Sequence, residues 1–266
     1  MARWTSWLRW LYGLGIRGRV SADPKHTQAH VFFQAAQLRA WSHALTVRIA
    51  KIEGDKETSF NTGSGVLIEF ANQRAVIGTA WHVLEEFRRL REDGQEVVLV
   101  CDNMPIATPR LVFADTTRDI GFIEVPPMGR SGLKAVPYRP KLLWPPPRVA
   151  KGDDVILCGF PKLLRVDGEE ILHGDLNLLL PVESSSDTVF YLQISWDNLI
   201  QAGTVTLPPE ITDFGGASGG PVFLVDAEAN PLVGLISQAG ENLPLWRIAP
   251  LCDLLDDLDT RATEPL

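Results

Sequence analysis

The feature that most constrains this chain is the hexapeptide at 215–220, which reads Gly-Gly-Ala-Ser-Gly-Gly. Glycine loses more backbone freedom on folding than any other residue, so four glycines around one serine indicate a place where the backbone itself must approach a ligand. Without side chains in the way, successive N–H groups can turn inward together and hold a negative charge that develops on an oxygen atom. Two interpretations follow from these residues alone: a nucleophilic Ser218, or a glycine-rich turn between two strands.

The positions of the histidines distinguish between two families that share this string. Residues 216–220 fit G-x-S-x-G, the motif of the α/β-hydrolases, in which the catalytic histidine follows the serine along the chain. With Pro221, the same residues also resemble the G-x-S-G-G-P motif of the trypsin-like peptidases, in which His and then Asp precede the serine. All five histidines precede Ser218, which excludes the hydrolase order: His26, His30, His43, His82 and His173.

His82 is the candidate general base. The residues before it predict two strands, Gly63 to Phe70 and Ala75 to Ala80, joined by a polar turn. Trp-His-Val follows at 81–83, and the whole segment resembles the trypsin-like pattern of G-S-G, hydrophobic strand, turn and V-x-T-A-x-H-V. In that pattern the histidine stands at the end of a strand and opens a short helix. Its imidazole has a pKa near neutrality, so it can take a proton from serine at physiological pH.

Asp119 is the candidate acid of the triad. It immediately precedes the alternating apolar run at 120–125, which resembles the strand that follows the catalytic aspartate in trypsin-like peptidases. Asp115 is the other carboxylate nearby, but it lies in the preceding loop. By resemblance, Asp119 holds the His82 tautomer and stabilises the imidazolium that forms during attack. The order His82, Asp119, Ser218 is therefore that of the family.

The resemblance, which covers roughly 45 to 258, implies an all-β protein of two antiparallel six-stranded β-barrels with the triad in the cleft between them. We expect a helical extension at 1–44, the first barrel at 45–132, a proline-rich linker at 133–150, and at 151–266 the second barrel with a short C-terminal helix near 251–258. The start of the second barrel, Gly152 to Pro161, resembles bacterial trypsin-like peptidases of the high-temperature-requirement type. No PDZ-like tail is expected, because few residues remain after the last helix.

The resemblance also assigns the substrate-binding residues. The N–H groups of Gly216 and Ser218 would form the oxyanion hole. Thr212 would lie at the base of the pocket for the residue before the scissile bond (P1), and the strand Ser237-Gln238-Ala239 would pair with substrate backbone. A pocket floored by Thr212 and narrowed by Ala239 suits small or medium uncharged side chains. A register slip of one would instead place Asp213 there and favour a basic side chain.

Two of these neighbouring residues carry further expectations. Ser237 resembles the family serine that buttresses the catalytic aspartate. Ala217 departs from the family, which usually has Asp or Asn directly before the nucleophile. In secreted trypsin-like enzymes that Asp receives a newly cut N-terminal ammonium group, so we expect this chain not to depend on such an activation step.

Composition limits the partners and cofactors. The formal net charge is −8 over 266 residues, with a pI near 5.2, which argues against nucleic-acid binding. Three well-separated cysteines form no CxxC pair, so neither a disulfide framework nor a zinc site is indicated: Cys101, Cys158 and Cys252. We therefore expect reduced thiols, a cytoplasmic protein, and no metal or cofactor.

The N-terminus predicts two helices. At 100° per residue, Trp4, Trp7, Leu8, Leu11 and Leu14 share one face of a helix within residues 1–20. Its apolar run is too short to span a bilayer and lacks the features of a signal peptide. The helix either packs on the body of the protein or lies on a membrane or a protein partner. A second helix is expected over about 26–42.

These patterns predict a serine endopeptidase that cleaves protein or peptide substrates through an acyl-enzyme intermediate. An alternative from another class is a protease-fold module that binds extended peptides without turnover and is recruited through its N-terminal helix.

Overall fold

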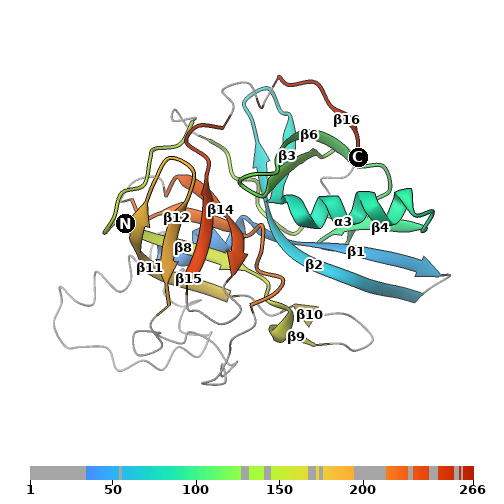
Figure 1. Cartoon of the computed structure of the whole chain (residues 1–266), viewed down its shortest axis with the longest axis horizontal. Helices are drawn as coiled ribbons and strands as arrows, with labels where there is room; N and C mark the ends of the chain where they lie inside the picture. Colours follow the sequence, from blue (N-terminus) through green and yellow to red (C-terminus); the bar gives the residue numbers. More distant parts are fainter. Residues whose placement is uncertain are drawn as a thin grey trace, which may run out of the picture.

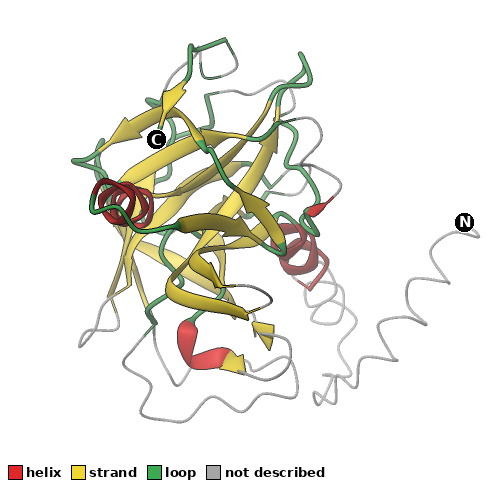
Figure 2. Ribbon diagram, turned by 90° about the vertical axis from the view of Figure 1, so that its right-hand side faces the viewer, coloured by secondary structure: helices red, strands yellow, loops and turns green. Residues whose placement is uncertain are grey.

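The computed structural model describes residues 34–53, 56–126, 132–140, 145–166, 172–173, 176–194, 214–226, 230–239, 245–254, 258 and 260–266. Within these residues the chain is mostly β, with two large β units (Figures 1 and 2). The all-β prediction is confirmed in this form. A helix at 34–42 precedes the first strand, and it coincides with the described part of the helix predicted over about 26–42. The predicted helix within 1–20 lies outside the described residues.

The first unit is an eight-stranded antiparallel sheet in the order β16-β6-β7-β3-β2-β1-β4-β5. Within the described part of the chain this order ends in two free edges, so the unit is a half-barrel with more strands than the predicted six-stranded barrel. The helix α3 (Trp81–Glu92) follows β3. The strands are β1 (Ala44–Glu53), β2 (Lys56–Glu69), β3 (Ala75–Ala80), β4 (Val97–Cys101), β5 (Met104–Ile106), β6 (Arg110–Asp115), β7 (Ile120–Glu124) and β16 (Glu264–Pro265).

The second unit is a closed barrel in the order β11-β12-β15-β14-β13-β8. A small hairpin of β9 (Arg165–Val166) and β10 (Leu172–His173) follows the 3₁₀ turn η2 (Lys162–Leu164). The barrel strands are β8 (Asp154–Gly159), β11 (Leu176–Ser185), β12 (Phe190–Gln193), β13 (Pro221–Leu224), β14 (Leu232–Ala239) and β15 (Leu245–Pro250).

The end of the chain returns to the first unit. β16 pairs with β6, so the C-terminus lies beside the first sheet, although the sequence analysis assigned it to the second barrel (Figure 1). The C-terminal helix expected near 251–258 is not found: within that range, residues 251–254 and 258 form turns and 255–257 lie outside the described residues. Leu251, Leu254 and Leu258 are buried against both units, and this packing replaces the helical face that their spacing suggested.

The two units meet across a shared apolar cluster. Ile68 and Phe122 of the first sheet pack in one buried group with Phe223 and Leu235 of the barrel. In the described part of the connecting segment, Tyr138 forms a bridge with Ile68 of β2, and its hydroxyl accepts a hydrogen bond from Leu232 N–H at 3.2 Å. In this packing, β2 lies against β13 and β8, and β3 lies against β14. Among the described residues, no helix is long and apolar enough to cross a membrane.

Candidate active site

His82 is exposed because it stands where a buried strand becomes a helix. All six residues of β3 are buried, and the chain leaves the core at the first turn of α3. The residue before the helix, Ala80, offers no side-chain cap. Asp119, the residue directly before β7, supplies the side-chain cap instead. Its Oδ1 accepts the His82 backbone N–H at 2.8 Å, and its carbonyl oxygen accepts Trp81 N–H at 3.1 Å. The acid therefore also satisfies two of the helix's unpaired donors.

The same carboxylate holds the His82 ring. Asp119 Oδ2 lies 2.8 Å from His82 Nδ1. A carboxylate can only accept, so Nδ1 carries the proton in the neutral ring and Nε2 keeps its lone pair. The His82 side chain is 47% exposed and that of Asp119 22%, so the ring is open to a substrate while the acid is largely covered. This arrangement makes His82 chemically competent to accept a proton at Nε2.

The turn before β7 shows why Asp119 and not Asp115 faces the histidine. Asp115 Oδ1 accepts the N–H groups of Thr117 and Arg118 at 2.9 and 3.0 Å, which closes the turn. Asp119 then adopts a φ of 60°, a left-handed conformation that aspartate tolerates better than most residues. One carboxylate builds the turn, and the other points at His82.

Ser218 lies in a tight loop whose peptide groups are almost all engaged. Gly215 O accepts Lys162 N–H at 2.6 Å, and Ala217 N–H donates to Phe214 O at 3.0 Å. Gly219 N–H donates to Ile236 O, and Gly220 N–H to Ala217 O. Two donors remain: among the described residues, the N–H groups of Gly216 and Ser218 donate to no protein acceptor. These are the two groups that the sequence assigned to the oxyanion hole.

Two of the loop glycines are required by conformation and by space. Gly216 and Gly219 have φ values of 95° and 86°. A Cβ on Gly219 would lie 2.2 Å from Ser64 O and 2.6 Å from Ala80 N. The loop backbone thus touches β2 and the end of β3, the strand that leads into the helix of His82, and a side chain at 219 would push them apart.

The loop also reaches the first turn of α3 through β2. A Cβ on Gly63 would lie 2.8 Å from Val83 Cγ2 and 3.2 Å from Ser218 O, so Gly63 fits between the helix and the nucleophile loop. The Ser218 hydroxyl makes no hydrogen bond to another described residue. The arrangement therefore gathers a serine hydroxyl, a histidine–carboxylate pair and two free N–H donors at the junction of the two β units.

A family model for the trypsin-like peptidase domain matches residues 63–235. The chain belongs to the trypsin-like peptidase family. No curated protein matches the sequence significantly. Among solved structures, a thermostable serine protease from an extremophilic microorganism is 15% identical, with 80% of this chain and 93% of that chain covered and a TM-score of 0.48.

Part of the predicted substrate site of this trypsin-like domain can be placed. Thr212 and Asp213 lie outside the described residues. Gln238 and Ala239 pair with β15 on one side, while the pairing of β14 with β13 ends before them. Within the described residues, the other edge of this strand segment is open, and the Gln238 side chain is exposed.

Ser237 does not make the contact that the sequence suggested. Its Oγ donates to Arg247 O at 3.1 Å, and no hydrogen bond joins it to Asp119 within the described residues. The reason is a β-bulge between Ile236 and Gln238, where two residues of β14 oppose one position of β15. A bulge turns the extra residue's side chain to a new direction. Ser237 is that extra residue.

An aromatic pair lies beneath the nucleophile loop. Trp246 of β15 is fully buried, pairs in register with Ala239, and packs on Phe214 with ring centroids 5.0 Å apart. Ala217 belongs to the same buried cluster. Ala217, the residue before Ser218, is therefore buried in the same barrel core as these two large rings.

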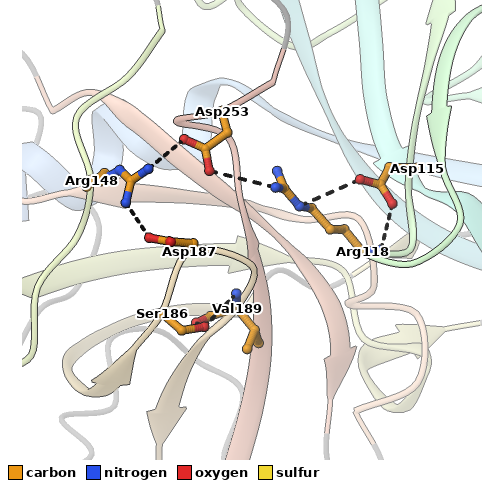
Figure 3. A network of polar contacts seen from close by, with 7 residues as sticks. All are labelled: Asp115, Arg118, Arg148, Ser186, Asp187, Val189 and Asp253. Carbon is orange, nitrogen blue, oxygen red and sulfur yellow. Dashed lines mark hydrogen bonds and ion pairs between the residues drawn. The ribbon is translucent and has the colours of Figure 1, made fainter.

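A row of alternating positive and negative side chains connects the turn before β7, which contains Asp115 and Asp119, with the barrel (Figure 3). Arg118 lies 3.6 Å from Asp115 and 3.7 Å from Asp253, and Asp253 lies 3.1 Å from Arg148. Arg148 also pairs with Asp187 in the β11–β12 turn. Arg148 is mostly exposed, so its pairs contribute little, whereas Arg118 is only 14% exposed. The inner pair, Arg118 with Asp253, holds the turn before Asp119 against the segment after β15.

Ser64 and Lys162 contact the nucleophile loop directly, although neither was among the site residues predicted from the sequence. Ser64 lies in the G-S-G motif that predicted a strand, and Lys162 contributes only its backbone N–H. The motif itself was the available signal for Ser64. Neither its burial nor its partner could be read from the spacing.

Proposed function

We propose that this chain is a serine endopeptidase. His82 Nε2 takes the proton of Ser218 Oγ as the hydroxyl attacks a peptide carbonyl, and Asp119 keeps the imidazole oriented and stabilises its charged form. The developing oxyanion accepts the N–H groups of Gly216 and Ser218. Collapse of the tetrahedral species releases the amine and leaves an acyl-enzyme, which water then hydrolyses.

One observation carries this proposal. Ala217, Gly219 and Gly220 donate their N–H groups to backbone carbonyls, whereas among the described residues the N–H groups of Gly216 and Ser218 have no acceptor. A glycine-rich turn that served only to join two strands would have no reason to keep two donors free. The His82–Asp119 contacts of 2.8 Å support the same chemistry.

The substrate is an extended peptide or an unfolded protein segment. The open edge at Gln238 and Ala239 supports pairing with substrate backbone, with Ser237 at the start of that segment. The buried Trp246–Phe214 pair beside Ala239 supports a shallow pocket, so we expect small, uncharged P1 side chains over large or charged ones. Thr212 at its base is part of this proposal.

The wider setting is proposed from the sequence alone. All three cysteines are free thiols, in line with a reducing, cytoplasmic location. The segment 1–20 would hold the enzyme at a membrane surface or a protein partner, and the bacterial high-temperature-requirement subtype stays a prediction.

Hydrolysis of fluorescently labelled casein tests the function. We expect Ser218→Ala to reduce the rate by roughly 10⁴-fold or more, because the covalent route is lost. Ser186→Ala, which removes an exposed hydroxyl from the β11–β12 turn, is the matched control and should retain full activity. A p-nitrophenyl ester should give a burst equal to the enzyme concentration if an acyl-enzyme accumulates. Tight binding of casein without turnover by the wild-type chain would replace the proposal with that of a peptide-binding module.

A further inference from the structure

Ser64 is a fully buried serine on β2 that bonds to the nucleophile loop at two places. Its Oγ donates to Gly216 O at 2.7 Å, and its backbone N–H donates to Ser218 O at 2.7 Å. Its Oγ also accepts Phe160 N–H at 2.8 Å. These bonds join the first β unit to both sides of Ala217.

The direction of the hydroxyl proton is fixed by its neighbours. Phe160 N–H can only donate, so the Ser64 oxygen must accept there. The single O–H proton is then available for Gly216 O, which can only accept. A buried hydroxyl with one acceptor and one donor partner has one orientation, so this contact is specific.

The bonds fix both peptide planes next to Gly216. Glycine can rotate about either backbone bond, and Gly216 holds a φ of 95°. The plane between Gly215 and Gly216 is held by the bond from Lys162 N–H to Gly215 O. The plane between Gly216 and Ala217 is held by Ser64 Oγ. Because C=O and N–H point in opposite directions across a trans peptide, the bond to Gly215 O sets the direction of the Gly216 N–H, and the bond from Ser64 to Gly216 O fixes the next plane, so that Gly216 cannot rotate between them.

Ala217 has no polar side chain with which to anchor this loop. Its Cβ contributes only packing within the barrel cluster. We propose that Ser64 is the positioning residue of the oxyanion loop: its hydroxyl holds the Gly216 carbonyl and so prevents rotation about the Gly216 backbone, which would otherwise move the Gly216 N–H from the place where the developing oxyanion needs it. This inference rests on the proposed peptidase function. Ser64 acts through Gly216 and does not touch substrate.

A rhodamine-linked fluorophosphonate tests the proposal, because its P=O oxygen needs the same donors while it modifies Ser218. We expect Ser64→Ala to lower the limiting labelling rate constant by ~10- to 100-fold, less than the loss on deleting an oxyanion donor outright, which is about 10²- to 10³-fold. The reagent concentration at half the limiting rate should change by less than ~3-fold. Ser185→Ala is the matched control, because it removes a serine hydroxyl that donates to a backbone carbonyl, Val149 O, at 2.6 Å. It should label at the wild-type rate.

The amplitude of labelling separates positioning from folding. If Ser64 only stabilised the fold, Ser64→Ala would lower the fraction of protein that can be labelled, and the folded fraction would react at the wild-type rate. That result would overturn the inference. Should Ser64→Ala not fold, Ser64→Cys keeps a weak donor and is expected to label at an intermediate rate, and a wild-type rate would count against the proposal. Absence of Ser218 labelling in the wild-type chain would instead overturn the proposed function, and this inference with it.

Discussion

Replacing Asp119 by asparagine is expected to remove nearly all activity while leaving the fold intact. Both carboxylate oxygens of Asp119 accept from His82: Oδ1 from the backbone N–H and Oδ2 from Nδ1, each at 2.8 Å. An asparagine has only one acceptor oxygen. Because the backbone N–H must donate, that oxygen stays with the helix, and the side-chain amide then faces Nδ1 as a donor. The ring must accept at Nδ1 and carry its proton on Nε2, where it can no longer take the serine proton.

The size of this loss follows from the role of the lost tautomer. A triad in which the acid becomes an amide loses about 10⁴-fold in kcat, which corresponds to about 5 kcal/mol of transition-state stabilisation. Stability should change little, because asparagine caps helices about as well as aspartate. Initial rates of casein or ester hydrolysis, together with thermal melting, measure both quantities.

Asp115→Asn is the matched control. Its retained oxygen can still accept the N–H groups of Thr117 and Arg118, and it does not contact His82. We expect less than a ~3-fold change in rate. Asp119 does not have this role if Asp115→Asn costs as much activity as Asp119→Asn, or if Asp119→Asn stays within tenfold of wild type.

Three other perturbations have defined outcomes. Gly219→Ala places a Cβ 2.2 Å from Ser64 O at positive φ, so it should lower the free energy of unfolding in urea by at least ~3 kcal/mol. Gly94 also has a positive φ but has open space around it, so Gly94→Ala should lower this free energy by only about 1 kcal/mol. Equal losses would contradict the packing argument. Burial lowers the pKa of His43 below 6.5, with a smaller contribution from Arg39, while the bond to Val136 O opposes it. Protonation of His43 therefore favours the unfolded chain, so its contribution to stability should be fully present above about pH 6.5 and should decrease at lower pH by at most ~1.4 kcal/mol per pH unit. His43→Gln should flatten the dependence of the melting temperature on pH between pH 7 and 5. An unchanged slope would exclude His43 as the source of that dependence. Deleting residues 1–20 should leave ester turnover unchanged and reduce binding to vesicles or a partner; a truncated chain that cannot fold would assign the segment to the core.

The order of the catalytic candidates could be read from the sequence because each one adjoins a strand with a clear pattern. His82 follows a strand of six buried residues, and Asp119 precedes the apolar run of β7. The choice of Asp119 over Asp115 rested on that adjacency. In the structure, the carboxylate of Asp119 faces His82 and that of Asp115 closes the turn.

Other features depend on contacts that no local pattern encodes. Leu251, Leu254 and Leu258 have helical spacing, but they are buried between the two β units by a turn that Asp253 also anchors through Arg118. Strand β16 has only two residues, so it carries no alternation that could reveal its pairing with β6. These elements exist because of tertiary packing, and the first sheet therefore has more strands than the sequence predicted.

The partners of two serines were equally inaccessible. Whether Ser237 points to Asp119 or to Arg247 depends on a single bulge in β14. The contact of Ser64 with Gly216 joins residues 152 positions apart, and it forms only when the two β units dock. Side-chain direction at such places is set by the register and the interface.

Mass-spectrometric mapping of a fluorophosphonate adduct tests the central claim most directly, because only a serine activated by its own neighbours reacts readily. We expect one adduct, on Ser218, in the wild-type chain, and labelling at least ~10³-fold slower in His82→Ala. Adducts at another serine, or equal labelling of wild type and His82→Ala, would contradict this claim.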